Sequence, residues 1–520
     1  MNFIDTNIFE DLSPDARGLY DSTFVMFGVV FSSIMRFVVV ASLWALVHAG
    51  LYAQDPASSA QRRDSLARSA RTARSRDSAD TSAPSALPEW TPRVGSANWV
   101  PGLLGTQVNY ITQHLARSHA AYLGPNSLDP NGDTQTSQAY GIYAGMFVSR
   151  RLQGYLDVEM IRGGGINHAT GVAGITDGDV LRQGSVDLGS GPYVARGYLK
   201  YTVPFDNDTQ DTLQRAQDQL PMIVASRRLE IIAGKTAATD YFDLNRYANT
   251  TRQQFSNWGL FQNTAWDYAA DTRGYSNGIA VSWITPLYTV RVGSFQMPKL
   301  ANGNKFDSDL LHARGDQIEL TVNARATATV IRALAWMNHA RMGSYQVALD
   351  NAARARTART ADTVPNVVAD DQPGRLKYGY GLNVEQPLAD SGETGLFARA
   401  GWSDGANESF VFTEADRHLS IGLQLSGAHW GRTADRFAIA GVQHGIVDVH
   451  QRYLAAGGVG FLLGDGALTY GPEQVLESYY RAQLGQFVQI GPDIQVIRNP
   501  GYNRDHSTVT VLGFRVNGRY

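Results

Sequence analysis

From residue 98 to the end of the chain, apolar residues recur at every second position in short stretches. In residues 152–161, for example, the even positions are mostly apolar, and the odd positions hold Gln153, Tyr155, Asp157 and Glu159. A period of two is the pattern of half-buried β-strands, and the same part of the chain lacks sustained helical periodicity. The pattern therefore predicts an all-β fold.

Four further stretches repeat this alternation: residues 193–203, 279–292, 418–425 and 508–520. The alternation in 279–292 breaks at residues 285–287, which predicts a hairpin with a tight turn. In 193–203 we expect one apolar and one polar face. The apolar face comprises Tyr193, Ala195, Leu199, Tyr201 and Val203, and the polar face comprises Arg196, Tyr198, Lys200 and Thr202.

The strands differ from those of a soluble sandwich in number and in what joins them. Aromatic residues lie near strand ends, and the chain ends on an aromatic residue, Tyr520. Some connections are short, and others are long and polar: 162–192, 205–226, 240–275 and 350–376. Short turns at one end and long loops at the other are typical of an outer-membrane barrel. At roughly ten residues per strand plus a connection, residues 98–520 fill a barrel with strands in the mid-teens.

The residue pattern near the N-terminus predicts a targeting segment. Arg36 precedes an apolar run that closes with small residues at Ala53, which predicts a signal peptide over 35–53 and a mature chain beginning near Gln54. We interpret residues 1–34 as an over-long start or a leader. The alternative is a membrane anchor over 24–52, although Arg36 would then lie at its centre, where a charge is costly.

Residues 54–97 are rich in Ser, Ala and Arg and end in a Pro-containing stretch. This composition predicts a flexible spacer, since it offers little apolar surface to bury. A basic arm that contacts anionic lipid or cell wall is the alternative.

Composition limits the chemistry that the chain can perform. It contains no Cys, which excludes disulfides, Cys-based metal sites and Cys nucleophiles. Acidic and basic residues balance within 54–520, so the basic excess that nucleic-acid binding requires is missing. The segment 234–236 ends like a phosphate-binding loop, but Leu229 stands where that loop needs Gly. We therefore predict no catalytic residue, no metal, no cofactor and no nucleic-acid partner.

Several segments resemble one family of proteins. The stretch 234–248, which reads Gly-Lys-Thr-Ala-Ala-Thr-Asp-Tyr-Phe-Asp-Leu-Asn-Arg-Tyr-Ala, is similar to a motif of the carbohydrate-selective porins of the OprB type. Further matching segments follow in the same order as in that family: 124–128, 167–174, 255–258, 266–271, 274–275, 397–405, 471–480 and 499–505. The resemblance spans about residues 100–520 and implies a transmembrane antiparallel β-barrel of about 16 strands with long extracellular loops, which passes sugars by facilitated diffusion.

Side chains that face the lumen are the candidate sugar-binding residues. A sugar presents hydroxyl groups at its rim and C–H bonds on its faces, so a selective channel needs polar groups and aromatic planes. Two strand faces and the Gly-rich segment 162–192, which we expect to fold inward, supply both. The predicted substrate-binding residues are Tyr155, Asp157, Glu159, Asn167, Asp177, Arg196, Tyr198 and Lys200. The same residues also fit a wall that merely solvates a water-filled channel. Their mixed charges argue against a strong ion preference.

The sequence thus predicts an outer-membrane porin, embedded in lipid, that admits mono- and small oligosaccharides to the periplasm. The alternative is an outer-membrane barrel with another role, such as a lipid hydrolase or a structural or adhesive barrel. A hydrolase would need an outward-facing Ser/His pair with supporting partners, and the sequence offers none. The sequence leaves open which sugar is carried and whether the barrel forms a homo-oligomer.

Overall fold

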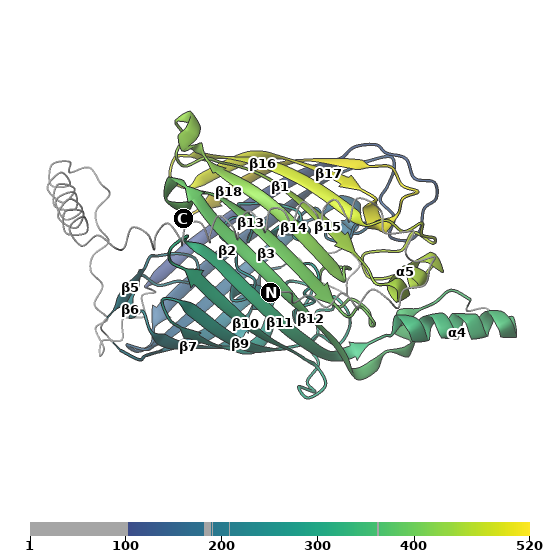
Figure 1. The fold of residues 1–520 in the computed structure, drawn as a ribbon, viewed down its shortest axis with the longest axis horizontal. Coiled ribbons are helices and arrows are strands. Elements are labelled where there is room, and N and C mark those ends of the chain that lie inside the picture. The colour runs from purple at the N-terminus through teal and green to yellow at the C-terminus, as the bar shows by residue number, and fades with distance from the viewer. Residues whose placement is uncertain (1–101, 181–188, 190, 207–208, 361–362) are drawn as a thin grey trace, which may run out of the picture. The chain divides into compact units, whose positions relative to one another are not determined.

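The computed structural model describes residues 102–180, 189, 191–206, 209–360 and 363–520. Within this part, sixteen antiparallel strands form a closed barrel, in which β1 pairs with both β2 and β18 (Figure 1). The barrel strands are β1 (Leu103–Leu115), β2 (Asp133–Phe147), β3 (Leu152–Gly163), β4 (Tyr193–Pro204), β7 (Arg228–Thr236), β8 (Ser276–Ile284), β9 (Tyr288–Gln296), β10 (Arg314–Ala324), β11 (Thr329–Met342), β12 (Gln372–Ala389), β13 (Thr394–Ser403), β14 (Arg417–Ser426), β15 (Arg436–Gly445), β16 (Glu473–Leu484), β17 (Val488–Arg498) and β18 (Val509–Arg519). The predicted fold class is confirmed.

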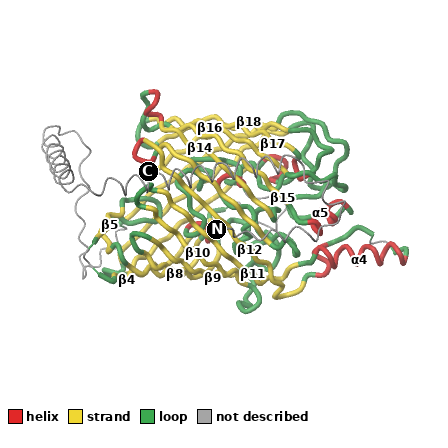
Figure 2. The backbone as a smooth tube through the Cα atoms, in the orientation of Figure 1, coloured by secondary structure: helices red, strands yellow, loops and turns green. Residues whose placement is uncertain are grey.

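The remaining elements lie in the connections between barrel strands (Figure 2). A separate two-stranded sheet pairs β5 (Gln210–Leu213) with β6 (Met222–Ala225). The helices are α3 (Trp258–Phe261), α4 (Tyr345–Ala358) and α5 (Asp448–Ala455), and the 3-10 turns are η3 (Ile166–Ala169), η4 (Ala238–Asp240), η5 (Val367–Asp370), η6 (Asp390–Gly392), η7 (Gly427–Trp430) and η8 (Pro500–Tyr502). Among the described residues, no helix has the length and apolar character needed to span a bilayer. The predictions for residues 1–34, 35–53 and 54–97 lie outside the described part.

The alternation of the strands sorts their side chains between lipid and lumen. In β18, Leu512 and Phe514 are exposed on the outer face, whereas Arg515 and Asn517 are buried in the lumen. The outer face carries aromatic pairs at its edges, such as Trp283 against Tyr288 at 5.6 Å, beside the tight turn predicted at 285–287. An apolar outer band with aromatic edges is what a bilayer requires of a spanning barrel.

One predicted face is wrong. In β4, Tyr193 and Ala195 were expected on the outer face, but Ala195 is fully buried and Val194 is exposed instead. The cause is a β-bulge: Arg196 pairs with Asp157, whereas Val194 pairs with the next residue of β3, so Ala195 has no partner of its own. An extra residue in one strand inverts the alternation beyond it, and Tyr193 therefore turns inward.

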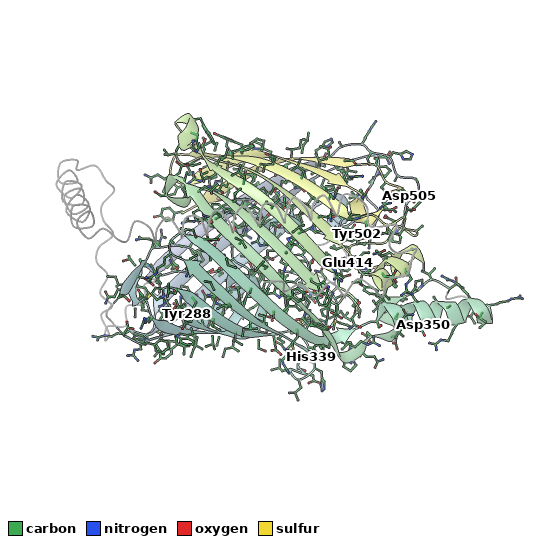
Figure 3. The ribbon with its side chains drawn as sticks, in the orientation of Figure 1. Tyr288, His339, Asp350, Glu414, Tyr502 and Asp505 are labelled. Carbon is green, nitrogen blue, oxygen red and sulfur yellow. The ribbon has the colours of Figure 1, made fainter. Side chains whose placement is uncertain are left out.

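The connections divide between the two ends of the barrel. One end has the short turns 285–287, 325–328 and 485–487 and is the end at which β18 finishes, which identifies it as periplasmic. The opposite, extracellular end carries the longest loops, including α4 and α5 (Figure 1). There Tyr502 donates a hydrogen bond to the backbone carbonyl of Glu414 at 2.7 Å, far from Tyr288 at the periplasmic edge (Figure 3).

Two features of the connections determine how much of the lumen is filled. The extracellular loops fold into the barrel, because residues 169–180 and most of 254–272 are buried, as are residues 408–416. The predicted inward folding of the 162–192 loop is confirmed for residues 169–180. The second feature was not expected: the long connection 205–227, which contains β5 and β6, lies at the periplasmic end.

Candidate functional site

A cavity of about 360 Å³ lies in the lumen between the inner wall and the inward-folded loops. The wall of the cavity is formed by residues of β1, β3 and β4, and most of the remaining lining comes from the 237–275 loop. The ionisable acidic and basic residues of the lining are Glu159, Asp179, Arg196, Asp218, Asp240, Arg252 and Arg273. Acidic and basic groups are thus mixed in one space, as the sequence predicted for the lumen.

Arg196 is the central cation of this cavity. Its guanidinium donates two hydrogen bonds to Asp240, from Nε to Oδ2 and from Nη2 to Oδ1, both at 2.7 Å. A third hydrogen bond runs from Nη1 to Asp157 Oδ2 at 3.1 Å, and Asp218 Oδ2 lies 3.5 Å from Nε. Since a guanidinium has five N–H groups, two remain for a solute. The planar fork is thus held rigidly with part of its edge free.

Asp240 is fixed by the segment that resembled the porin motif. Its carboxylate accepts hydrogen bonds from the Thr236 hydroxyl at 3.0 Å and from the backbone N–H of Ala237 at 3.1 Å. The segment begins at Gly234, whose φ of +139° favours glycine, and a Cβ there would lie 2.4 Å from the carbonyl oxygen of Gly197. The backbone at Gly234 on β7 can therefore lie close against the neighbouring strand β4, and the segment that follows places Asp240 beside Arg196.

Asp218 is the third carboxyl group beside Arg196. Burial and the nearby carboxylates of Asp157 and Asp240 together raise the pKa of Asp218 to about 8, against the opposing effect of Arg196. Because Asp240 and Asp157 already balance the guanidinium, a proton on Asp218 avoids a third negative charge at one cation. Asp218 is therefore a neutral hydrogen-bonding group at pH 7.

Beside the ion pairs of Arg196 lies a second cluster of charged side chains, centred on Arg252. Arg252 donates from Nη1 to Glu159 Oε1 and from Nε to Asp179 Oδ1, both at 2.9 Å. Glu159 Oε2 also accepts a hydrogen bond from the Tyr275 hydroxyl at 2.6 Å. The ring of Tyr275 in turn lies 5.1 Å from the Arg196 guanidinium. Tyr275 thus connects the two arginine groups.

Aromatic rings from the loops form the apolar part of the lining. Trp258 stacks on Phe412 with ring centroids 4.6 Å apart, and Tyr268 lies 5.9 Å from the same Phe412 ring. The backbone N–H of the neighbouring Val411 donates to the Asp267 carboxylate at 2.9 Å, which ties the 404–416 loop to the 237–275 loop. The rings of Trp258, Tyr268 and Phe412 therefore line the same cavity as the charged groups.

The barrel wall holds the 237–275 loop in place through buried charges. Arg399 on β13 is fully buried and donates to the backbone carbonyls of Ala248 at 2.6 Å and Leu260 at 3.1 Å. Glu477 on β16 accepts hydrogen bonds from the backbone N–H groups of Ser256 and Asn257. Buried charges are tolerated where hydrogen bonds satisfy them, and here the partners are loop backbone atoms. The loop is accordingly a fixed part of the site.

The predicted residues fall into two groups. Asp157, Glu159 and Arg196 meet at the cavity, as described above. Tyr155 and Tyr198 stack on each other at 5.0 Å and do not belong to the lining of the cavity. Lys200 lies nearer the periplasmic end, 3.3 Å from Glu230.

The two predicted residues of the 162–192 loop lie away from the cavity. Asn167 donates to the backbone carbonyl of Ser127 at 2.9 Å, among the extracellular loops. Asp177 packs against the wall and accepts a hydrogen bond from the Ser137 hydroxyl at 2.6 Å. Gly178, Asp179 and Val180 of the same loop line the cavity instead.

The predicted site missed the residues of the 237–275 loop. Asp240 and Trp258 lie in segments that supported the family resemblance, so a signal for them was present in the sequence. Arg252, Gln217 and Asp218 lie in connections without periodicity, so no pattern of residues places them at the cavity.

Comparisons with known proteins agree with this architecture. The family model described as carbohydrate-selective porin, OprB family, matches residues 161–520. A search of the curated proteins found no match. Among solved structures, the high-pH structure of Pseudomonas putida OprB is similar, with a TM-score of 0.59 and 13% identity over 81% of this chain and 94% of that chain. The outer-membrane channel DcaP of Acinetobacter baumannii gives a TM-score of 0.43 and 9% identity over 80% of this chain and 96% of that chain.

The family match covers well over half of the chain, and the closed sixteen-stranded barrel with its inward-folded loops is consistent with it. The chain therefore belongs to the OprB family of carbohydrate-selective porins, and it is an outer-membrane porin for carbohydrates.

Proposed function

We propose that the cavity around Arg196 is the place at which a sugar is recognised as it crosses the barrel. The observation that carries this proposal is the combination of the Arg196 edge with the aromatic rings of Trp258 and Phe412 across one cavity. Charged groups can exchange hydrogen bonds with hydroxyls, and aromatic faces can cover C–H surfaces. A cavity with only one of these features would suit an ion or an apolar compound instead.

Within this proposal the predicted binding residues have different roles. Arg196 and Glu159 contact the solute, together with Asp179, Asp240 and Arg252 from the loops. Asp157 orients Arg196 through their hydrogen bond. The residues that support the surrounding wall and loops are Tyr155, Tyr198, Lys200, Asn167 and Asp177.

The size of the cavity favours small sugars. About 360 Å³ lies near the lower end of the range of pockets that hold small molecules, roughly 300–1,000 Å³. We infer that mono- and small oligosaccharides pass by facilitated diffusion. Because acidic and basic groups alternate around the cavity, ions should pass without a strong preference for either sign. The apolar outer band contacts outer-membrane lipid, and a homo-oligomer stays a prediction.

Liposome swelling tests this proposal. Proteoliposomes containing the purified porin should swell in a monosaccharide, more slowly in a disaccharide, and scarcely in a long oligosaccharide. Polyols and zwitterionic amino acids of similar mass serve as controls for size alone. If those controls enter as fast as the sugars, the cavity sieves by size and does not recognise carbohydrate.

A further inference from the structure

The periplasmic connection between β4 and β7 enters the lumen. Strands β5 and β6 form a hairpin, and its tip closes with a pair of backbone hydrogen bonds between Ala216 and Gln219, both at 3.2 Å. The two residues at the turn are Gln217 and Asp218, and Asp218 adopts a left-handed φ of +56°. We call residues 210–225 the inner hairpin.

The tip of the inner hairpin reaches the central cation of the site. Gln217 Nε2 donates to Asp157 Oδ2 at 3.3 Å, and Asp218 Oδ2 lies 3.5 Å from Arg196 Nε. Both tip residues line the cavity. A segment that starts at the periplasmic end therefore forms part of the floor of the cavity.

One apolar residue anchors the inner hairpin to the wall. Leu220 is 1% exposed and packs in a cluster with Leu103, Tyr143, Tyr155, Tyr198 and Ile232. Its backbone N–H donates to the Tyr155 hydroxyl at 3.2 Å. Arg215 adds one hydrogen bond to the backbone carbonyl of Leu104. At the base of the hairpin Val224 and Ala225 are also buried, whereas most of its other residues are partly or largely exposed, including Ile223.

The inner hairpin and the 237–275 loop differ in how they are attached. The loop is held by buried charged side chains of several barrel strands, as Arg399 and Glu477 illustrate. The hairpin forms its own two-stranded sheet with four residues in each strand, separate from the barrel strands. Its base is held by buried Val224 and Ala225 and by the hydrogen bond from Arg228 to Asp211, whereas its tip depends on Leu220 and a few polar contacts. Local opening requires breaking few contacts, so the hairpin is the element of the lumen that opens at the lowest cost.

We propose that the inner hairpin is a periplasmic gate of the channel, anchored by Leu220 and latched at Arg196. In the closed position its tip lies across the floor of the cavity. When Leu220 leaves its cluster, the tip withdraws toward the periplasm and the path widens. The gate acts on the water-filled path, so ion current reports its position without any sugar and independently of sugar recognition.

Single-channel recording in planar bilayers tests the gate. Leu220→Ala removes most of the anchor, and the matched control Ile223→Ala removes an exposed apolar residue from the same hairpin. Leu220→Ala should raise the mean ion conductance roughly two-fold, as expected of an aqueous barrel that loses an internal obstruction, and Ile223→Ala should conduct like the wild type. A folded Leu220→Ala channel with wild-type conductance would overturn the proposal.

A second variant decides the question if Leu220→Ala fails to assemble. The chain contains no Cys, so Gln217→Cys introduces the sole thiol. A cationic methanethiosulfonate reagent added from the periplasmic side should modify it and lower the current roughly two-fold, because the adduct narrows an aqueous path. Ser149→Cys, in the exposed β2–β3 turn, should be modified without effect on current. Complete modification at position 217 with unchanged current, or no modification there, would refute a gate in the conducting path.

Discussion

Arg196 on the barrel wall and Asp240 in the inward-folded loop form a two-pronged ion pair, with both N–H···O distances at 2.7 Å. The pair joins two segments that are 44 residues apart and sets the wall against the loop across the cavity. It also fixes which edge of the guanidinium a solute can reach. The electrical balance of the cavity depends on it.

Asp240→Asn should make the channel more selective for anions. The substitution keeps the shape of the side chain but removes the negative charge that balances Arg196, leaving a more positive cavity. The reversal potential in a salt gradient measures the change. Asp206→Asn, which removes a carboxylate paired with Arg227 outside the cavity, is the control and should leave the reversal potential unchanged. An identical potential in both variants would mean that the cavity around Arg196 lies outside the path of ions.

Arg399→Ala should release the 237–275 loop while the barrel still forms. Removing one partner from a buried charged network costs about 3–5 kcal/mol, and here the carbonyls of Ala248 and Leu260 lose their donor. Trypsin should then cut the loop at Arg252, whose side chain is 15% exposed and paired with Glu159 and Asp179 while the loop is in place. Cleavage is read by mass spectrometry, and gel mobility with and without heating reports the folded barrel.

The control for this experiment is Arg325→Ala in an exposed periplasmic turn. It should give the wild-type pattern of fragments. Full protection of the loop in folded Arg399→Ala would show that the remaining contacts, such as those of Glu477, hold it without Arg399.

Alkaline pH should loosen the tip of the inner hairpin. The raised pKa of Asp218, about 8, means that the closed tip binds this proton more tightly than an open, solvated tip does. The attachment is therefore strongest at acid pH, weakens as the pH rises above the ordinary pKa of Asp, and loses this contribution above about 8. Mean conductance should rise from about pH 5 to about pH 8 and level off above that.

The groups around Asp218 define the control. Asp218 faces Asp157 and Arg196 on the wall and Asp240 on the loop. Its charge also acts on three tyrosine hydroxyls, those of Tyr155, Tyr198 and Tyr241. Asp218→Asn keeps a neutral group at the tip at every pH. This variant should show a flat profile from about pH 5 to about pH 8, and a rise equal to that of the wild type would assign the effect to another group.

Much of the barrel could be predicted from alternation, because lipid and water impose opposite side chains on successive residues of a spanning strand. The strand faces of 152–161 and 508–520 follow this rule. The β4 bulge breaks it, since an unpaired Ala195 leaves no trace in the residue pattern and is set by pairing with β3. The inward turn of Tyr193 follows from that single extra residue.

Of the residues at the cavity, only those on the barrel wall could be predicted from the sequence. Arg196, Asp157 and Glu159 lie on strands, where a period of two assigns them to the lumen. Arg252 and Asp218 lie on connections, whose course depends on long-range contacts such as those of Arg399 and Leu220. Those contacts join residues far apart in sequence, and neither composition nor spacing reveals them.

The central claim, that sugars are recognised at Arg196, is tested most directly by sugar block of the ion current through single channels. The matched control is Arg332→Ala, which removes a lumen-facing arginine that is 13% exposed, as Arg196 is, and is paired with Glu385 at 3.2 Å. We expect Arg196→Ala to raise the half-blocking sugar concentration about ten-fold, equivalent to about 1.4 kcal/mol, the scale of a hydrogen bond to a charged group. Arg332→Ala should match the wild type. An unchanged half-blocking concentration in a folded Arg196→Ala channel would contradict the account and place recognition elsewhere in the barrel.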